Sequence, residues 1–265
     1  MSENTRTIRE KPPKLHLTDL SEDWRLKMNS VERVAVVTGA SRRIGAAITQ
    51  QLLAKGYGVV TSSRKITNTS RPNLVEVTGD ISQPETGALI IQKAKEHFGR
   101  VDTLINNAGA FLAKPFTEYT SSEFTTLLQV NLGGFFHISQ RAIAEMLHRE
   151  SGHIVNITSS LLAERPLKGL PAALTAITKG GLNAVTRSLA IEYADKGIRV
   201  NAIAPRAIRT PMHAMETHAF LATLHPMGRI GEIQSIVDAV LYLEGANFVT
   251  GEILHVDGGA HAGLW

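Results

Sequence analysis

The chain has 265 residues, of which 43% are apolar, and this is enough to bury one large core in a single domain. Cysteine is absent, which excludes disulfide frameworks, thiol nucleophiles and thiolate metal sites. The formal net charge is +4, but the basic residues are spread out and form no run interleaved with aromatics, so we expect no nucleic-acid partner. No stretch approaches the roughly 18 apolar residues of a membrane span, and the start of the chain shows no apolar signal segment. We therefore expect a cytoplasmic protein with no membrane partner.

The first 29 residues differ from the rest of the chain. They carry charges of both signs and the run Lys11-Pro12-Pro13-Lys14, which cannot sit inside a helix or a central strand. We expect residues 1–29 to form a flexible N-terminal arm, followed by one domain at 30–265.

From there on, strand-like and helix-like segments alternate. Short apolar runs predict strands at 34–37, 58–61, 73–77, 102–105, 153–158, 199–203 and 253–256. Helical periodicity predicts helices from Ile44 up to Lys55-Gly56 and at 85–98, 122–148, 173–193 and 233–243. This alternation predicts an α/β fold, a doubly wound, Rossmann-like parallel sheet in one domain. Ligands bind such sheets beyond the carboxyl ends of the strands, so functional residues are expected just after strands.

The segment 38–45 follows the first predicted strand and opens the first helix. It contains Gly39 and Gly45, and a helix beginning at Ile44 would offer backbone N–H groups and a positive helix end to a pyrophosphate. Two glycines in a turn are also explained by turn geometry alone. The strand before the loop and the helix after it favour a dinucleotide-binding loop.

The end of the second predicted strand indicates which dinucleotide is bound. An acidic residue there would favour the ribose hydroxyl of NADH, but this chain has Arg64 and no carboxylate. Arg64, together with Arg42 or Arg43, can grip a 2′-phosphate through charge-assisted hydrogen bonds. We therefore expect NADPH (NADP) in preference to NADH, and the alternative is that these arginines are ordinary surface charges.

Several motifs resemble the short-chain dehydrogenase/reductase family over nearly the whole chain from Val31, and in particular its 3-oxoacyl-reductase-like members. Segment 38–45 resembles the family's TGxxxGxG loop, 106–109 its NNAG segment and 256–259 a motif near its C-terminus. The resemblance implies an NAD(P)-dependent oxidoreductase acting on a small carbonyl or alcohol compound, and association into a dimer or tetramer. The cofactor-binding positions that these patterns imply are Gly39, Ser41, Arg42, Arg43, Ile44, Gly45, Arg64, Asp80, Ile81, Asn107, Ala108, Gly109, Lys179, Pro205, Ile208 and Thr210.

The resemblance also implies a catalytic set. In the family a tyrosine supplies a proton, a lysine four residues later lowers its pKa and holds the ribose, a serine orients the carbonyl and an asparagine supports a water relay. Lys179 and Asn131 match two of these positions, and Ser159 or Ser160 matches the serine. The tyrosine position is occupied by Thr175, whose aliphatic hydroxyl is shorter and less acidic than a phenol.

Three further departures accompany the missing phenol. The stretch from Ser159 or Ser160 to Thr175 is a few residues longer than the family's usual spacing. Arg206 stands where the family usually has a glycine beside the nicotinamide, and Arg43 replaces the middle glycine of the loop. An unusual proton donor is conceivable in segment 212–218, where His213 titrates near neutrality. His213, Glu216 and His218 also suggest a metal, but three polar residues in one flexible stretch are usually solvated, and we expect none.

Two functions follow from these patterns. The first is an NADPH-dependent oxidoreductase with an atypical proton donor. The second is a dinucleotide-binding protein with little or no turnover, acting as a sensor or a partner subunit, and Thr175 is the residue that keeps this second possibility open.

Overall fold

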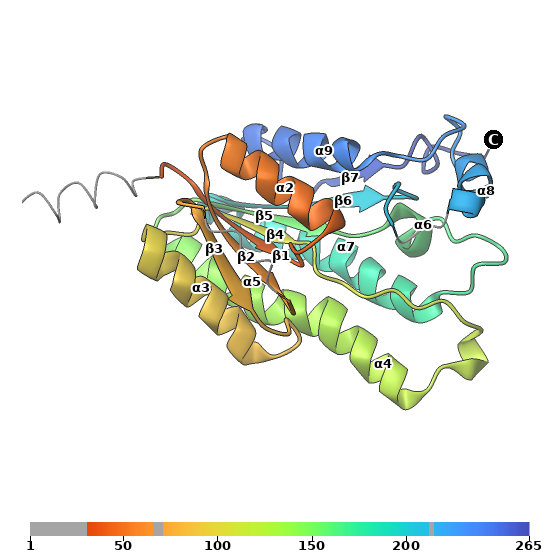
Figure 1. Ribbon diagram of the computed structural model, residues 1–265, viewed down its shortest axis with the longest axis horizontal. Coiled ribbons are helices and arrows are strands. Elements are labelled where there is room, and N and C mark those ends of the chain that lie inside the picture. Colours follow the sequence, from red (N-terminus) through yellow and green to blue (C-terminus); the bar gives the residue numbers. More distant parts are fainter. Residues whose placement is uncertain (1–30, 66–70, 212–214, 265) are drawn as a thin grey trace, which may run out of the picture. The chain divides into compact units, whose positions relative to one another are not determined.

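The computed structural model describes residues 31–65, 71–211 and 215–264 (Figure 1). Seven parallel strands form one sheet in the order β3-β2-β1-β4-β5-β6-β7. The strands are β1 (Val34–Thr38), β2 (Gly58–Ser63), β3 (Leu74–Thr78), β4 (Thr103–Asn106), β5 (Gly152–Ile157), β6 (Ile198–Pro205) and β7 (Ile253–Val256). The prediction of a single-domain, doubly wound parallel sheet is confirmed, whereas the predicted arm lies outside the described residues.

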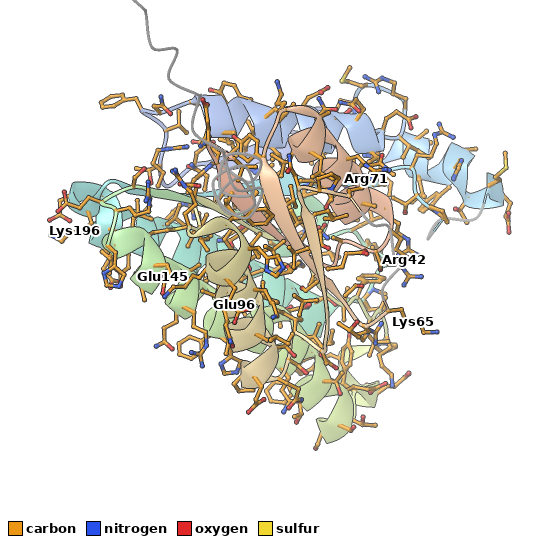
Figure 2. The ribbon with its side chains drawn as sticks, turned by 60° about the vertical axis from the view of Figure 1, so that its left-hand side comes forward. Arg42, Lys65, Arg71, Glu96, Glu145 and Lys196 are labelled. Atoms are coloured by element: carbon orange, nitrogen blue, oxygen red, sulfur yellow. The ribbon has the colours of Figure 1, made fainter. Side chains whose placement is uncertain are left out.

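Helices cover both faces of this sheet. The longer ones are α2 (Arg43–Ala54), α3 (Pro84–Phe98), α4 (Ser121–Leu128), α5 (Gly134–Leu147), α7 (Ala173–Tyr193) and α9 (Ile233–Gly245). Shorter pieces are α6 (Ser160–Ala163), α8 (His218–Thr223), a π-helical turn (Gln129–Gly133) and 3-10 turns at Phe116–Glu118, Ala194–Lys196 and Met215–Thr217. Charged side chains such as Glu96 and Glu145 lie on the outer surfaces of α3 and α5 (Figure 2). None of the described helices is both long and apolar enough to cross a membrane.

Strand β1 shows why both faces must be covered. Val34 and Val36 pack into one apolar cluster with residues of α3, α5 and α7, while Ala35 and Val37 pack into a second cluster with α2 and α9. Successive strand residues point to opposite faces, so an unbroken apolar run is what a strand buried on both sides requires. These apolar runs are the pattern from which the sequence predicts the strands.

The strand order reverses at β1, which pairs with β2 on one side and β4 on the other. The chain therefore leaves the carboxyl ends of β1 and β4 in opposite directions, and a crevice for ligands is expected between them. This switch point lies between the segment after Thr38 and the segment after Asn106.

The sequence predicts one continuous helix over 122–148, and this prediction is wrong in detail. The segment consists of α4 and α5 joined by the π-helical turn Gln129–Gly133, which contains Asn131. A π turn adds one residue to a helical turn without changing its composition, so the apolar period does not reveal it. Such turns are frequent at functional sites.

A buried polar cluster lies at the other edge of the sheet, near the amino ends of its strands. The Glu244 carboxylate on α9 accepts hydrogen bonds from the Tyr57 and Thr103 hydroxyls, both at 3.0 Å, and from the buried His153 ring. Arg33 adds an ion pair at 3.2 Å. Burial, together with the negative charge of Glu244, raises the pKa of Tyr57 to about 12. Burial also lowers the pKa of His153, which is consistent with a neutral ring that donates to Glu244 from Nδ1.

Candidate active site at the carboxyl edge of the sheet

The loop after β1 packs tightly against the segment after β4. Gly39 has φ +67°, and a Cβ added there would lie 2.9 Å from the Ala108 Cα. A Cβ on Gly45 would lie 2.5 Å from the Asn107 side-chain nitrogen. Both distances are shorter than any ordinary contact, so the packing of the two loops itself requires glycine at these positions.

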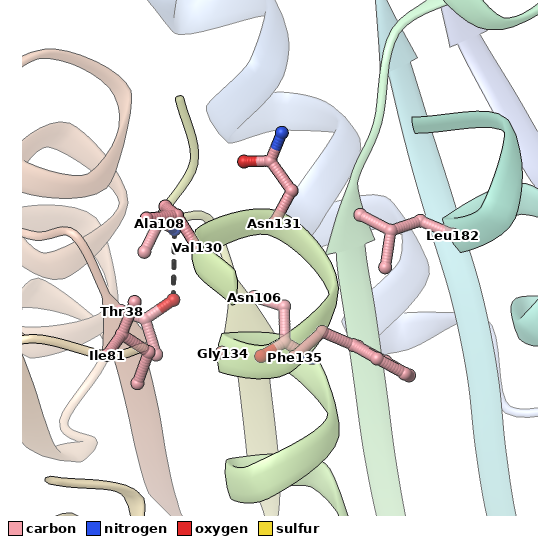
Figure 3. Close-up of a pocket in the computed structure, with 9 residues that line it drawn as sticks. All are labelled: Thr38, Ile81, Asn106, Ala108, Val130, Asn131, Gly134, Phe135 and Leu182. Carbon is pink, nitrogen blue, oxygen red and sulfur yellow. Dashed lines mark hydrogen bonds between the residues drawn. The ribbon is translucent and has the colours of Figure 1, made fainter. Parts of the chain in front are cut away.

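Hydrogen bonds hold the same two loops together. The Thr38 hydroxyl accepts from the backbone nitrogens of Asn107 and Ala108 at 3.1 and 3.0 Å, and Figure 3 shows the second of these bonds beside the π turn. The Asn107 side chain donates to the carbonyl oxygens of Thr38 and Gly39. Asn107, which the sequence analysis assigns to cofactor binding, thus links the two loops at the switch point through its side-chain nitrogen.

The start of α2 fits a phosphate group. The helix begins at Arg43, and within the residues that the structure describes its N-cap residue Arg42 makes no capping side-chain hydrogen bond, so the first backbone N–H groups suit an anion. Arg43 has φ +57°, and its Nε is buried without a hydrogen-bond partner in the described part of the chain. Ser41 and Arg42 are exposed at the same turn, while Ile44 is half-buried. An unmatched buried donor beside an open helix end suits the dinucleotide that the sequence predicts.

The positions expected to contact the adenosine end lie near one another. Arg64 is exposed directly after β2. Asp80 accepts from the Ser82 backbone and hydroxyl; these bonds, and more weakly the nearby charge of Arg64, hold the pKa of Asp80 below its ordinary value. Ile81 contacts Gly134, at the start of α5. Arg42 and Lys65 lie on the same side of the molecule in Figure 2, so basic side chains follow the carboxyl ends of β1 and β2.

Asn131 connects the segment after β4 to α7. Its Oδ1 accepts from the Ala110 backbone nitrogen at 2.7 Å, and its Nδ2 donates to the Ala110 carbonyl oxygen and to the Thr178 hydroxyl. The side chain is 2% exposed. The amide is thus engaged in positioning the backbone beside the site, and Figure 3 shows it on the helical turn that lines the same pocket as Thr38 and Ala108.

Lys179 lies next to this segment. Its Nζ donates to the Ile157 carbonyl oxygen at the end of β5, at 2.8 Å. A Cβ on Gly109 would lie 3.2 Å from that Nζ and 3.2 Å from the Asn131 Oδ1, so Lys179, Gly109 and Asn131 are brought together. Burial lowers the pKa of Lys179 to about 8.

The structure distinguishes the two candidate serines. Ser160 is fully buried; its hydroxyl lies 3.5 Å from the Pro205 carbonyl oxygen and also interacts with the Asp257 carboxylate. Ser159 caps α6 by accepting from the Leu162 nitrogen at 3.3 Å, and it remains partly exposed. Because that bond uses only a lone pair, the Ser159 hydroxyl proton is still available for a ligand.

The Thr175 side chain is buried and hydrogen-bonded to the backbone of the segment after β4. Its hydroxyl donates to the Leu112 carbonyl oxygen at 3.1 Å and accepts from the Leu112 nitrogen at 3.2 Å, and the side chain is 1% exposed. The phenol of Tyr119 donates to the same Leu112 oxygen at 3.0 Å, a proximity that no spacing in the sequence indicated. Thr175 therefore stands at the expected position but holds a loop in place.

The segment after β6 completes the site. Ile208 forms a bridge to Gly231 and is buried, as is Thr210, and both follow Pro205 at the carboxyl end of the strand. Arg206 is half-buried, and burial lowers its pKa although the Asp257 carboxylate opposes the shift.

The histidine-rich segment gives no support to a metal site. His213 lies outside the described residues. Nδ1 of His218 lies 3.1 Å from Nη1 of Arg209, a cation. No group of three or more potential ligands suitable for a metal ion occurs among the described residues.

Comparison with known proteins identifies the family. The family model described as enoyl-(acyl carrier protein) reductase matches residues 39–261. The chain is 35% identical to 3beta-hydroxysteroid dehydrogenase 1 of Eggerthella lenta, covering 86% of this chain and 93% of that protein. It is 33% identical to the 3-oxoacyl-[acyl-carrier-protein] reductase FabG of Escherichia coli, covering 88% and 99% respectively. The structure of ElxO with NADP bound matches with a TM-score of 0.80 at 29% identity, over 87% of this chain and 99% of that one. The resemblance read from the motifs is confirmed: the chain belongs to the short-chain dehydrogenase/reductase family of NAD(P)-dependent oxidoreductases.

Proposed function

We propose that this protein binds NADPH and reduces a small carbonyl compound to an alcohol, with a proton donor other than the residue at position 175. The observation that carries this proposal is the convergence of Ser159, Lys179 and the backbone held by Asn131 at the carboxyl ends of β4 and β5. Such a reduction needs two groups: a hydroxyl that orients the carbonyl, and an acid whose pKa lies near neutral pH, here an ammonium group with a lowered pKa.

The preference for NADPH over NADH rests on charge. Arg64 and Arg42 are exposed around the crevice beyond β2, Arg43 has an unmatched buried Nε, and no carboxylate ends that strand. A 2′-phosphate offers these guanidinium groups charge-assisted hydrogen bonds that a hydroxyl cannot. The similar ElxO structures, one with NADP and one with NADPH bound, support the same choice.

Reduction of a carbonyl requires one hydride and one proton. NADPH, when bound, supplies the hydride, and this chain must supply the proton to the oxygen. Lys179 is the only ionisable member of the predicted catalytic set, and burial lowers its pKa to about 8, so its ammonium group is an acid of suitable strength near neutral pH. We assign the proton to Lys179 Nζ, and the hydrogen bond that orients the substrate oxygen to the Ser159 hydroxyl. Asn131 keeps the loop beside them in place.

A second candidate function is dinucleotide binding with little or no turnover, in a sensor or a partner subunit. The observation that favours it is the Thr175 hydroxyl, which is buried and fully engaged by Leu112. In this alternative the crevice would hold the cofactor while the proton transfer had been lost.

One experiment separates the two functions. NADPH oxidation is followed with a panel of ketones, aldehydes and quinones for the wild type, Lys179→Ala and Thr175→Tyr, and NADPH affinity is measured for each by calorimetry. We expect turnover by the wild type that falls at least 100-fold in Lys179→Ala. An inactive wild type that still binds NADPH, together with an active Thr175→Tyr variant, would support the binding function instead. A wild type that does not bind NADPH would overturn both.

A further inference from the structure

The helix α6 carries the serine to which we assign the orientation of the substrate. The helix has only four residues, Ser160–Ala163, with Ser159 immediately before it and Glu164 immediately after it. A single helical turn is not stable by its own hydrogen bonds, so its position depends on contacts with the rest of the protein. These contacts therefore determine where the Ser159 hydroxyl lies.

Glu164 links the end of α6 to the helix that carries Lys179. Its Oε1 accepts from the Asn183 side-chain nitrogen at 2.8 Å, and α6 packs against α7 (Figure 1). Asn183 is 5% exposed and follows Lys179 by one helical turn, so the two side chains lie on the same face of α7. The hydrogen bond thus links α6 to the helix face from which Lys179 reaches the end of β5.

Ser159 lies between two such links. Lys179 Nζ donates to the Ile157 carbonyl oxygen at 2.8 Å, just before the serine, and Glu164 accepts from Asn183 just after α6. Both links reach the same face of α7, so the segment 157–164 is attached to that helix on either side of Ser159. The separation between the Ser159 hydroxyl and the Lys179 ammonium group therefore depends on both.

Glu164 also joins α6 to β7. Its second oxygen, Oε2, accepts from the His255 ring, which stacks on the His261 ring with centroids 4.1 Å apart. The neighbouring Arg165 donates from Nη2 to the His261 carbonyl oxygen at 2.8 Å. The Glu164 carboxylate therefore contacts both α7 and β7, with one oxygen for each, and holds the helical turn from two sides.

We propose that Glu164 is a positioning residue for the reduction, which holds α6 in place and so sets the position of the Ser159 hydroxyl relative to Lys179. The inference rests on the proposed function, because that function assigns the reaction to Ser159 and Lys179. Glu164 acts through the position of the turn and not through its charge. Burial alone lowers the pKa of Lys179, without a contribution from the Glu164 carboxylate.

A double-mutant cycle with Ser159 tests this role. The rate of NADPH oxidation with the carbonyl substrate that the wild type reduces fastest is measured for the wild type, Glu164→Ala, Ser159→Ala and the double variant. We expect kcat to fall about tenfold in Glu164→Ala, because a small displacement of the group that orients the substrate is costly. In the Ser159→Ala background the same substitution should change kcat by less than about twofold, since no hydroxyl is left to position. NADPH affinity, measured by calorimetry, should not change.

Two further variants separate positioning from a general loss of structure. Glu164→Gln keeps an oxygen that accepts from Asn183, and it should restore most of kcat. Glu192→Ala, which removes an exposed carboxylate from α7, is the matched control and should react like the wild type. In Glu164→Ala, the fall of kcat/KM that follows from the Lys179 pKa of about 8 should stay at the same pH.

Hydrogen exchange tests the attachment of α6 without any turnover. The Leu162 amide donates to the Ser159 hydroxyl and the Ala163 amide to the Ser159 carbonyl oxygen, and both precede the substituted residue. We expect these two amides to exchange at least about fivefold faster in Glu164→Ala, and at the wild-type rate in Glu192→Ala. An inactive wild type would contradict the proposed function, and the exchange comparison then decides this inference by itself.

The proposal is overturned if Glu164→Ala lowers kcat equally with and without the Ser159 hydroxyl. Unchanged exchange of the Leu162 and Ala163 amides, or a shift of the pH profile, also overturns it. If Glu164→Ala does not fold, Asn183→Ala, which removes only the link to α7, is taken through the same cycle and the same exchange measurement, with the same criteria.

Discussion

The Thr175 hydroxyl makes two hydrogen bonds with the backbone of Leu112. Thr175→Val keeps the shape of the side chain and leaves the Leu112 N–H without its acceptor, while the carbonyl oxygen retains Tyr119. We expect the free energy of unfolding, measured by urea denaturation, to fall by about 1–3 kcal/mol. Thr126→Val, at an exposed position of α4, should change little. A variant of unchanged stability but abolished turnover would contradict the structural role and point to Thr175 in the chemistry.

Lys179 gives a prediction about pH. If its ammonium group donates the proton, the protonated fraction falls as pH rises through its pKa of about 8. We therefore expect kcat/KM for carbonyl reduction to be level below pH 8 and to drop about tenfold per unit well above it. Lys179→Arg keeps a charge that does not titrate in this range, so it should lose the descending limb along with most of the rate. The same descending limb in Lys179→Arg would assign the titration to another group.

Arg64 determines the preference between cofactors in our proposal. Arg64→Ala removes a guanidinium group beside Asp80 and should weaken NADPH binding by about tenfold or more, while NADH binding changes little. Both affinities are measured by calorimetry. Arg71→Ala, an exposed arginine preceding β3, is the matched control. Equal losses for the two cofactors would contradict recognition of the 2′-phosphate by Arg64.

At the scale of elements, the strands and most helices followed from apolar periodicity because burial on both faces leaves a continuous apolar run. Apolar periodicity did not predict the π turn around Asn131, because that turn is stabilised by hydrogen bonds to Ala110 and Thr178, which belong to distant parts of the chain. For the same reason, the sequence could not predict the different exposure of Ser159 and Ser160 or the hydrogen bonds of Thr175 to Leu112. Spacing predicts which residues reach one edge of the sheet, whereas tertiary contacts decide where each side chain points.

Glu244 ties α9 to the strands β4 and β5 through Thr103 and His153. Glu244→Gln replaces one acceptor oxygen by a donor nitrogen facing several donors, so we expect the free energy of unfolding to fall by about 3 kcal/mol or more. Urea denaturation measures the change. Glu145→Gln, which loses only a partly exposed ion pair with Lys95, should cost less than about 1 kcal/mol. Equal losses in the two variants would show that burial of the cluster adds nothing.

At the scale of the whole molecule, the family resemblance leads us to expect a dimer or tetramer. Among the exposed large apolar side chains, Phe124 on α4 (45%), Phe136 on α5 (55%) and Ile191 on α7 (82%) lie on helices of one face of the sheet, and Tyr242 on α9 (56%) lies on the other. Exposed apolar side chains favour association, and we test the face on which three of these four lie. Sedimentation velocity should show an oligomer that dissociates in Phe136→Glu, whereas Phe248→Glu, in the turn between α9 and β7, tests whether the effect is specific to that face. A monomeric wild type at micromolar concentration would contradict this expectation.

The Glu244 cluster and the candidate active site lie at opposite edges of one parallel sheet. The amino ends of the strands carry the buried carboxylate and its donors, and the carboxyl ends carry Ser159, Lys179 and the crevice. Mutations at the carboxyl edge therefore leave the Glu244 hydrogen bonds intact, so the fold can persist while the reaction changes. The hydrogen bonds that hold the amino ends of the strands together therefore do not depend on the side chains that face the crevice.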